Sequence, residues 1–141
     1  MTSLFSPRLA GKLLLGGLIA LALFHILVMI GVLPSGIVWA GQVENSAPDL
    51  LMMEAVSLVV TLLFILIVMI RLGYVLAGRL QTFTRICLWL IGAFFLLSMV
   101  GNLASDVVTE KVVMAPFAFI MAILSFRLAA TKQCESGSDH A

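Results

Sequence analysis

The sequence has little charge for its length. Only 11% of its 141 residues are Asp, Glu, Lys or Arg, and 62% are apolar; soluble globular proteins average about 25% charged and roughly 45–50% apolar residues. A water-soluble fold of this size could not bury so much apolar surface, so the composition favours helices packed against one another in lipid. The net charge of +1 gives no reason to expect a nucleic-acid partner.

Residues that carry most enzyme and metal chemistry are also scarce. Two cysteines, Cys87 and Cys134, are far apart and form no CxxC pair, which excludes a disulfide framework and argues against a thiol oxidoreductase. Two histidines, His25 and His140, are too few for a histidine-rich metal site, and the sequence contains no GxGxxG, P-loop or HExxH pattern. We therefore expect a protein that is not an enzyme and that needs no cofactor.

Four long apolar stretches are present instead. Each is long enough to cross a hydrocarbon core of about 30 Å as a helix that rises about 1.5 Å per residue. Their short connections predict an all-α, integral membrane fold, an antiparallel four-helix bundle formed by residues 1–132 and followed by a disordered polar tail, residues 133–141. The predicted helices cover about 13–33, 50–70, 86–103 and 112–130.

Turn-forming residues separate these stretches. Pro34 and Gly36 stop the first helix, because proline cannot continue the hydrogen-bond ladder and glycine tolerates a turn. Asp49 can cap the second helix. Pro116 falls in the first turn of the fourth helix, where a missing amide donor costs least.

Small and basic residues are expected to fix the helices in place. Gly16, Gly17 and Ala20 in the first helix are predicted positions of close helix packing, and so is Gly101 in the third. Arg71, at the end of the second helix, is expected to anchor that helix at the lipid headgroups.

The N-terminus allows a second interpretation. Arg8 and Lys12, the apolar run and then Val38 to Ala40 together resemble a secretory signal peptide with a cleavage site. The apolar run is longer than the roughly 7–15 residues of such a segment. We therefore expect an uncleaved first transmembrane helix.

Basic residues gather on one side of the predicted membrane domain. Under the positive-inside rule this side is cytoplasmic, so both termini are expected in the cytoplasm. Trp39 on the opposite side, with Tyr74 and Trp89 near the basic side, fits aromatic belts at the two interfaces. The basic side carries Arg8, Lys12, Arg71, Arg79, Arg85, Arg127 and Lys132. The other side carries Glu44, Asp49, Asp106, Glu110 and Lys111.

One carboxylate lies inside a predicted span. Glu54 is about one turn into the second helix, and facing lipid would cost it up to roughly 2.5–3.5 kcal/mol at the bilayer centre, less near the edge. It should therefore face protein or water. Ser57 and Thr61 follow at i+3 and i+7 on the same helix face, so we expect a narrow polar stripe that enters from the non-cytoplasmic side.

Further polar residues are predicted near the same membrane surface. Ser98 and Asn102 in the third helix can hydrogen-bond across a helix interface. His25 in the first helix, at a predicted depth of about 12 Å, can bond to Glu54 or to either of them. The first connection adds a tryptophan and a glutamine. The resulting candidate ligand or proton site is Glu54, His25, Asn102, Ser57, Thr61, Ser98, Gln42 and Trp39.

Structural roles are the alternative for the same residues. Glu54 can reach the interface and pair with Lys111 or with the Asp49 end of its own helix. His25 can simply pack, and Asn102 can cap the third helix. Hydrogen bonds between membrane helices contribute on average only about 0.6 kcal/mol each, so such contacts are common.

Several short segments stand out along the chain. They are Val38 to Gly41, Glu54 followed by Ser57 and Leu58, Arg71 to Tyr74, and Gly101 to Leu103 before Glu110 and Lys111. In combination they resemble a group of small four-helix bacterial membrane proteins without an assigned function, over most of residues 13–130. The resemblance implies a protein of the bacterial inner membrane and implies nothing about activity.

The architecture also resembles that of the small multidrug resistance transporters, four-helix proteins with one membrane-embedded glutamate. Their glutamate lies in the first helix, whereas Glu54 lies in the second and has different aromatic neighbours, so the likeness is one of architecture. Two functions stay open. The first is binding of a partner helix or small ligand through the polar cluster. The second is proton-coupled transport by a homodimer, in which Glu54 exchanges a proton for a cationic substrate.

Overall fold

The computed structural model describes residues 6–37, 47–76 and 78–131. Within these ranges the structure is all-α, and its four main helices, the last counted from Glu110, are long and apolar enough to cross a membrane. The predicted four-helix transmembrane fold is confirmed, while the predicted tail, 133–141, lies outside the described residues. The elements are α1 (Pro7–Met29), η1 (Ser35–Ile37), α2 (Ala47–Leu72), α3 (Gln81–Ala104), η3 (Glu110–Met114) and α4 (Ala115–Ala130).

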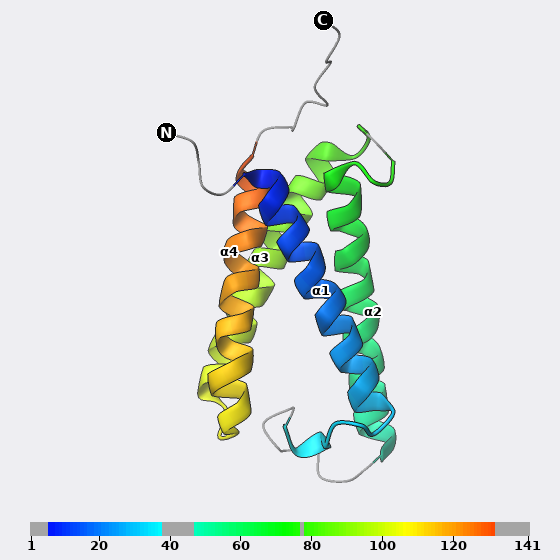
Figure 1. Cartoon of the computed structure of the whole chain (residues 1–141), viewed down its shortest axis with the longest axis vertical. Helices are drawn as coiled ribbons and strands as arrows, with labels where there is room; N and C mark the ends of the chain where they lie inside the picture. The colour runs from blue at the N-terminus through cyan, green and yellow to red at the C-terminus, as the bar shows by residue number, and fades with distance from the viewer. Residues whose placement is uncertain (1–5, 38–46, 77, 132–141) are drawn as a thin grey trace, which may run out of the picture.

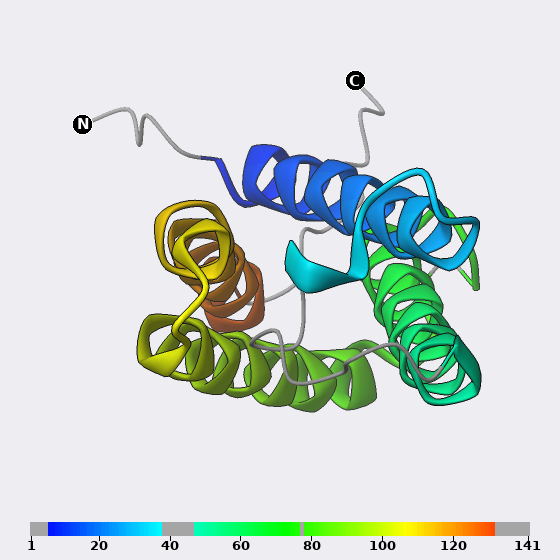
Figure 2. The same cartoon turned by 90° about the horizontal axis from the view of Figure 1, so that it is seen from below.

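Consecutive helices run antiparallel, in up-down-up-down order (Figure 1). α1 packs against α2 and α4, and α3 packs against the same two helices, which gives the four-membered ring seen end-on in Figure 2. The two ends of the bundle differ in charge. The basic end, where α1 begins, carries Arg8, Lys12, Arg71, Arg79, Arg85 and Arg127. The opposite, acidic end carries Asp49, Asp106, Glu110 and Lys111.

Local capping makes α1 begin earlier than the apolar run predicts. The Ser6 side chain accepts a hydrogen bond of 3.1 Å from the Leu9 amide. Pro7 follows at the first helical position, where its missing N–H costs nothing. Arg8 and Lys12 consequently lie in the first turns of α1, and their exposed side chains extend at the basic end.

Two helices end at glycines in the left-handed conformation. Gly31 follows α1 with φ +75° and Gly73 follows α2 with φ +81°. At each site two backbone amides bond back to carbonyls of the last helical turn, which is the Schellman arrangement. α1 therefore ends at Met29 and not at the predicted Leu33. His25 is consequently about 6 Å from the helix end, half the depth predicted from the sequence.

The other helix starts follow the same principle. α2 begins at Ala47, so Asp49 lies within its first turn, where the carboxylate complements the helix dipole, and does not cap it as predicted. Pro116 lies in the first turn of α4, as predicted. The π turn η3 precedes it, and in this turn the Ala115 amide bonds to the Glu110 carbonyl.

Three glycines let the helices approach closely. A Cβ added at Gly17 would lie 2.5 Å from the Met121 sulfur, and one at Gly92 would lie 2.6 Å from Cδ1 of Phe126. A Cβ added at Gly11 would likewise meet leucine side chains of α2 and α4. The prediction is thus confirmed for Gly17 only. It is wrong for three exposed positions, Gly16, Ala20 and Gly101.

The buried apolar core is concentrated toward the basic end. Its residues come from the first half of α1, the last third of α2, the first two thirds of α3 and most of α4. On α2 the fully buried apolar members begin only at Ile67, so this core thins toward the acidic end. The members are Ala10, Leu14, Leu18, Ile67, Val68, Leu88, Ile91, Phe95, Ala118, Met121, Ala122, Leu124, Leu128 and Ala129.

Arg71 ties the basic end together. Its Nη1 donates to the carbonyl and side-chain oxygens of Gln81, at 3.1 and 3.0 Å. Its Nη2 donates to the carbonyl of Thr131, just beyond α4. The guanidinium therefore links α2, α3 and the end of α4, and anchoring at the lipid headgroups stays a prediction.

Candidate functional site

The inward face of α2 becomes polar at the acidic end. Glu54 and Thr61, at i and i+7, are 1% and 4% exposed, and Val68 continues the same face into the apolar core. Ser57, between them, is half-buried. This spacing places the four side chains on one side of the helix. Glu54 therefore faces the interior of the bundle, as the sequence predicts.

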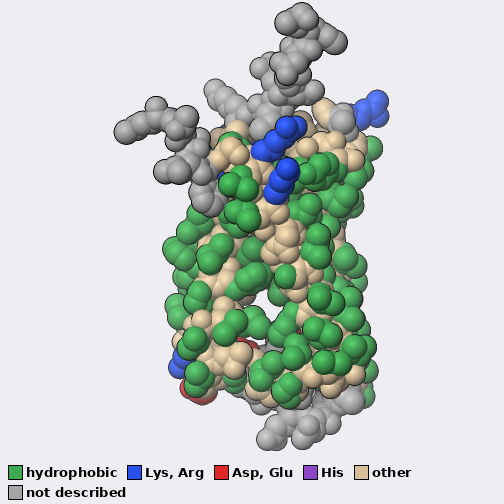
Figure 3. All heavy atoms as spheres, viewed as in Figure 1, with side chains coloured by type: hydrophobic (Ala, Val, Ile, Leu, Met, Phe, Trp, Pro, Cys, Tyr) green, Lys and Arg blue, Asp and Glu red, His purple; other side chains and the backbone are tan. Residues whose placement is uncertain are grey.

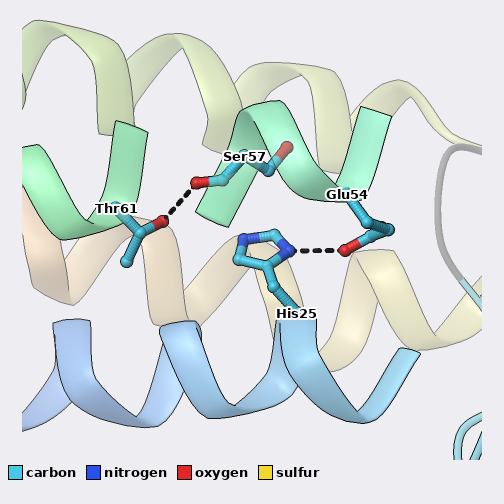
Figure 4. Close-up of polar contacts among 4 residues, drawn as sticks. All are labelled: His25, Glu54, Ser57 and Thr61. Atoms are coloured by element: carbon cyan, nitrogen blue, oxygen red, sulfur yellow. Dashed lines mark hydrogen bonds and ion pairs between the residues drawn. The ribbon is translucent and has the colours of Figure 1, made fainter. Parts of the chain in front are cut away.

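Glu54 is hydrogen-bonded to His25 of the neighbouring helix α1. The Nδ1 atom of His25 lies 2.6 Å from Oε2 of Glu54 (Figure 4). The imidazole is 13% exposed and the carboxylate is almost fully buried. Because a carboxylate within an apolar bundle is tolerated only when it is paired, this bond accounts for the presence of Glu54 in a membrane-spanning helix.

This bond also fixes the orientation of the imidazole. When Glu54 is ionised and His25 is neutral, the carboxylate only accepts hydrogen bonds, so Nδ1 donates and the ring lone pair is on Nε2. In Figure 4 the second ring nitrogen points away from Glu54, toward the side on which Ser57 and Thr61 lie. Nε2 makes no hydrogen bond to the described residues. A neutral His25 that donates from Nδ1 therefore offers Nε2 as a hydrogen-bond acceptor.

The hydroxyl of Thr61 is used within its own helix. Its Oγ1 donates to the Ser57 carbonyl at 2.8 Å (Figure 4). With its proton engaged in this way, the hydroxyl can offer only acceptor lone pairs to anything beside it. The polar stripe of α2 consequently presents more acceptors than donors.

A matching change from apolar to polar occurs on α3. Ser98 and Asn102 are half-buried, and their spacing continues the buried face of this helix beyond Phe95. The structure shows no hydrogen bond between these two residues and the His25–Glu54 pair within the described part of the chain. They lie at the same end of the bundle without direct bonding to the pair. The buried face before them consists of Thr84, Leu88, Ile91 and Phe95.

The bundle is hollowed at its acidic half. Figure 3 shows basic side chains at the upper end and an opening between the two sides of the molecule in the lower half. Small side chains face inward near this end, because Ala22 of α1 and Ala115 and Ala118 of α4 are buried. The acidic end thus combines a hollow with inward polar groups, whereas aliphatic side chains fill the basic end.

One buried carboxylate was missed by the sequence reasoning. Glu110, in the π turn η3, is only 6% exposed, although the sequence placed it among the charges outside the membrane. The sequence does not indicate that helical structure begins several residues before Pro116, so the burial of Glu110 in that turn could not be predicted. Gln42 and Trp39, also predicted for the site, lie outside the described residues. Among the residues that the structure describes, no group of three His, Cys, Asp or Glu side chains could hold a metal ion.

Comparison with known proteins adds no relative. No family model, no curated protein and no solved structure matches the chain. The resemblance to small bacterial membrane proteins is therefore supported only at the level of a small protein with four apolar helices.

Proposed function

We propose that this chain is a non-enzymatic, multi-pass membrane protein that binds a small polar ligand inside the acidic end of its bundle. The observation that carries the proposal is the 2.6 Å bond between His25 and Glu54, on inward-facing positions toward the acidic end of the bundle. Ionisable residues that face the interior of a membrane bundle commonly mark ligand or ion pathways. A partner helix would dock on the lipid-facing surface, so the inward direction of Glu54 favours a small ligand.

We further propose that the protein lies in a bacterial inner membrane with the basic end in the cytoplasm. The described basic residues, Lys111 excepted, lie at the basic end, which supports this orientation under the positive-inside rule. The bacterial assignment rests on the resemblance of short segments alone, and no matching protein adds to it. The candidate site would then lie nearer the periplasmic side.

A binding screen tests the proposed function. Purified protein in nanodiscs is screened by saturation-transfer NMR against small cations, anions and neutral polar compounds. We expect at least one compound to bind the unmodified protein and the Asp106→Asn variant, but not Glu54→Gln. Asp106 is an exposed carboxylate of the same end, so its variant controls for the loss of one charge. The proposal is wrong if no compound binds, or if binding is unchanged in Glu54→Gln.

Proton-coupled transport is the second candidate. It is favoured by the direct bond between a carboxylate and a titratable imidazole within membrane-spanning helices. In proteoliposomes with a pH-sensitive dye inside, a transported cation should drive proton movement that Glu54→Gln abolishes. Absence of proton movement with every cation tested would exclude transport and leave binding open.

A further inference from the structure

The described side chains of the acidic-end hollow are rich in hydrogen-bond acceptors. Glu54 can only accept when ionised, and a neutral His25 that donates to it from Nδ1 keeps an acceptor lone pair on Nε2. The Thr61 hydroxyl uses its hydrogen to donate a hydrogen bond to the Ser57 carbonyl. The hydroxyls and the amide of the remaining polar residues can accept as readily as they donate. A complementary ligand therefore has to bring hydrogen-bond donors.

The net charge of the acidic end also favours a ligand that brings hydrogen-bond donors, because it attracts cations. Two buried carboxylates, Glu54 and Glu110, are accompanied by the exposed Asp49 and Asp106, against a single exposed lysine among the described residues of the acidic end. The arginines of the basic end are roughly 25 Å away along the helices, so they affect the local potential less than the nearby carboxylates do. An anion would be repelled here, and a cation would be attracted.

We infer that the ligand carries a primary ammonium group that donates a hydrogen bond to Nε2 of His25. This inference rests on the proposed binding function and adds the chemical class of the ligand. An ammonium group combines a positive charge with three N–H donors, which matches a site rich in acceptors and negative charge. The negative charge of Glu54 acts through the imidazole, because its bond to Nδ1 makes Nε2 a better acceptor.

The number of N–H donors distinguishes a primary ammonium group from a quaternary one. A quaternary ammonium ion carries the same charge but has no N–H to donate. Recognition by charge alone would bind both, whereas recognition through His25 Nε2 requires the donor.

Four probes of similar size test this inference. Butylammonium, tetramethylammonium, butyrate and butanol are titrated into protein in nanodiscs, with 15N-labelled histidine and a His140→Gln background, so that the Nε2 signal of His25 reports binding directly. We expect butylammonium to shift this signal and to bind at least about tenfold more tightly than the other three, as expected for a charge-assisted hydrogen bond. Glu54→Gln should weaken butylammonium roughly ten- to hundredfold. Asp106→Asn should change it by about twofold or less.

The outcomes separate this inference from the proposed function. Equal binding of butylammonium and tetramethylammonium would overturn the donor argument, and preferential binding of butyrate or butanol would overturn the ligand class; in both cases a ligand site remains. If none of these probes and none of the compounds of the wider screen binds, the proposed function fails as well. The comparison of the four probes uses protein with an intact His25–Glu54 pair. It therefore tests the inference even if Glu54→Gln does not fold.

Discussion

At the scale of single residues, the side chain that matters most is His25, because Glu54 determines which of its nitrogens carries the proton. Nδ1 and Oε2 are 2.6 Å apart, and when the carboxylate is ionised and the ring neutral, Nδ1 donates and Nε2 is left as the acceptor. The same arrangement orients imidazoles beside carboxylates in metal sites and catalytic triads. In this bundle it turns a residue that could merely pack into one with a defined hydrogen-bonding direction.

Glu54→Gln is expected to release this control of the tautomer. A glutamine amide can either accept from Nδ1–H or donate to an unprotonated Nδ1, so both neutral tautomers of His25 become accessible. In 15N-histidine spectra the unmodified protein should show a protonated Nδ1 and an unprotonated Nε2, and the variant a mixture or the reverse. Identical spectra for both proteins would mean that Glu54 does not set the tautomer.

A second residue-scale prediction concerns Ser125 of α4, whose hydroxyl is fully buried without a hydrogen-bond partner among the described residues. A buried hydroxyl without a partner costs about 1–3 kcal/mol, so Ser125→Ala should leave the free energy of unfolding unchanged or raise it by up to about 1 kcal/mol. The matched control is Thr84→Ala, because the Thr84 hydroxyl is equally buried but donates to the Gln81 carbonyl at 3.1 Å.

Thr84→Ala should lower the free energy of unfolding by about 1 kcal/mol, measured in mixed micelles by titration with a denaturing detergent. If Ser125→Ala lowers stability as much as Thr84→Ala does, the Ser125 hydroxyl has a partner in solution.

At the scale of helices, the closest contact between α3 and α4 depends on Gly92. A Cβ there would lie 2.6 Å from Cδ1 of Phe126, whose ring also stacks at 5.2 Å on Trp89 and is therefore not free to move aside. Gly92→Ala should lower the free energy of unfolding by about 1–3 kcal/mol, since the helices must separate or the ring must leave its position.

The control for Gly92 lies in the same helix. Gly101 has no atom within 4 Å of an added Cβ, so Gly101→Ala should be neutral or should stabilise the helix by up to about 1 kcal/mol. Thermal unfolding of both variants in the same detergent makes the comparison. Equal losses for the two substitutions would show that helix propensity, and not the contact with Phe126, decides the effect.

The helices themselves were largely predictable, and their packing was not. Runs of apolar residues predict four spans because lipid requires them, whatever their neighbours. The ends of α1 depend on Ser6 and Gly31, local signals that the hydropathy pattern does not contain. Gly92 is a packing position and Gly101 is not, although both lie in α3, because the difference depends on what the neighbouring helix presents.

The candidate site was predictable for a related reason. His25 lies about one turn from the end of α1 and Glu54 about two turns from the start of α2, and apolar surroundings leave such groups few partners other than each other. The hollow itself could not be predicted, since it arises from how the helices diverge and from which small residues of α4 face inward.

At the scale of the whole molecule, the bundle is asymmetric along its axis. The basic end has the apolar core and the Arg71 hydrogen bonds that join α2, α3 and the end of α4, whereas the acidic end has polar inward faces and the hollow. The candidate ligand site therefore lies toward the acidic end. The side of the membrane on which that end lies decides from where the ligand comes.

Orientation can be tested with two exposed residues from opposite ends. In a background with Cys87→Ser and Cys134→Ser, Asp106→Cys places a thiol at the acidic end and Arg79→Cys places one at the basic end. Because all the described basic residues except Lys111 lie at the basic end, positive-inside insertion should leave Asp106→Cys outside the cytoplasm. A membrane-impermeant maleimide added to intact spheroplasts should label Asp106→Cys at once and Arg79→Cys only after lysis. Labelling in the opposite order would place the hollow in the cytoplasm, and the ligand would then have to be a cytoplasmic one.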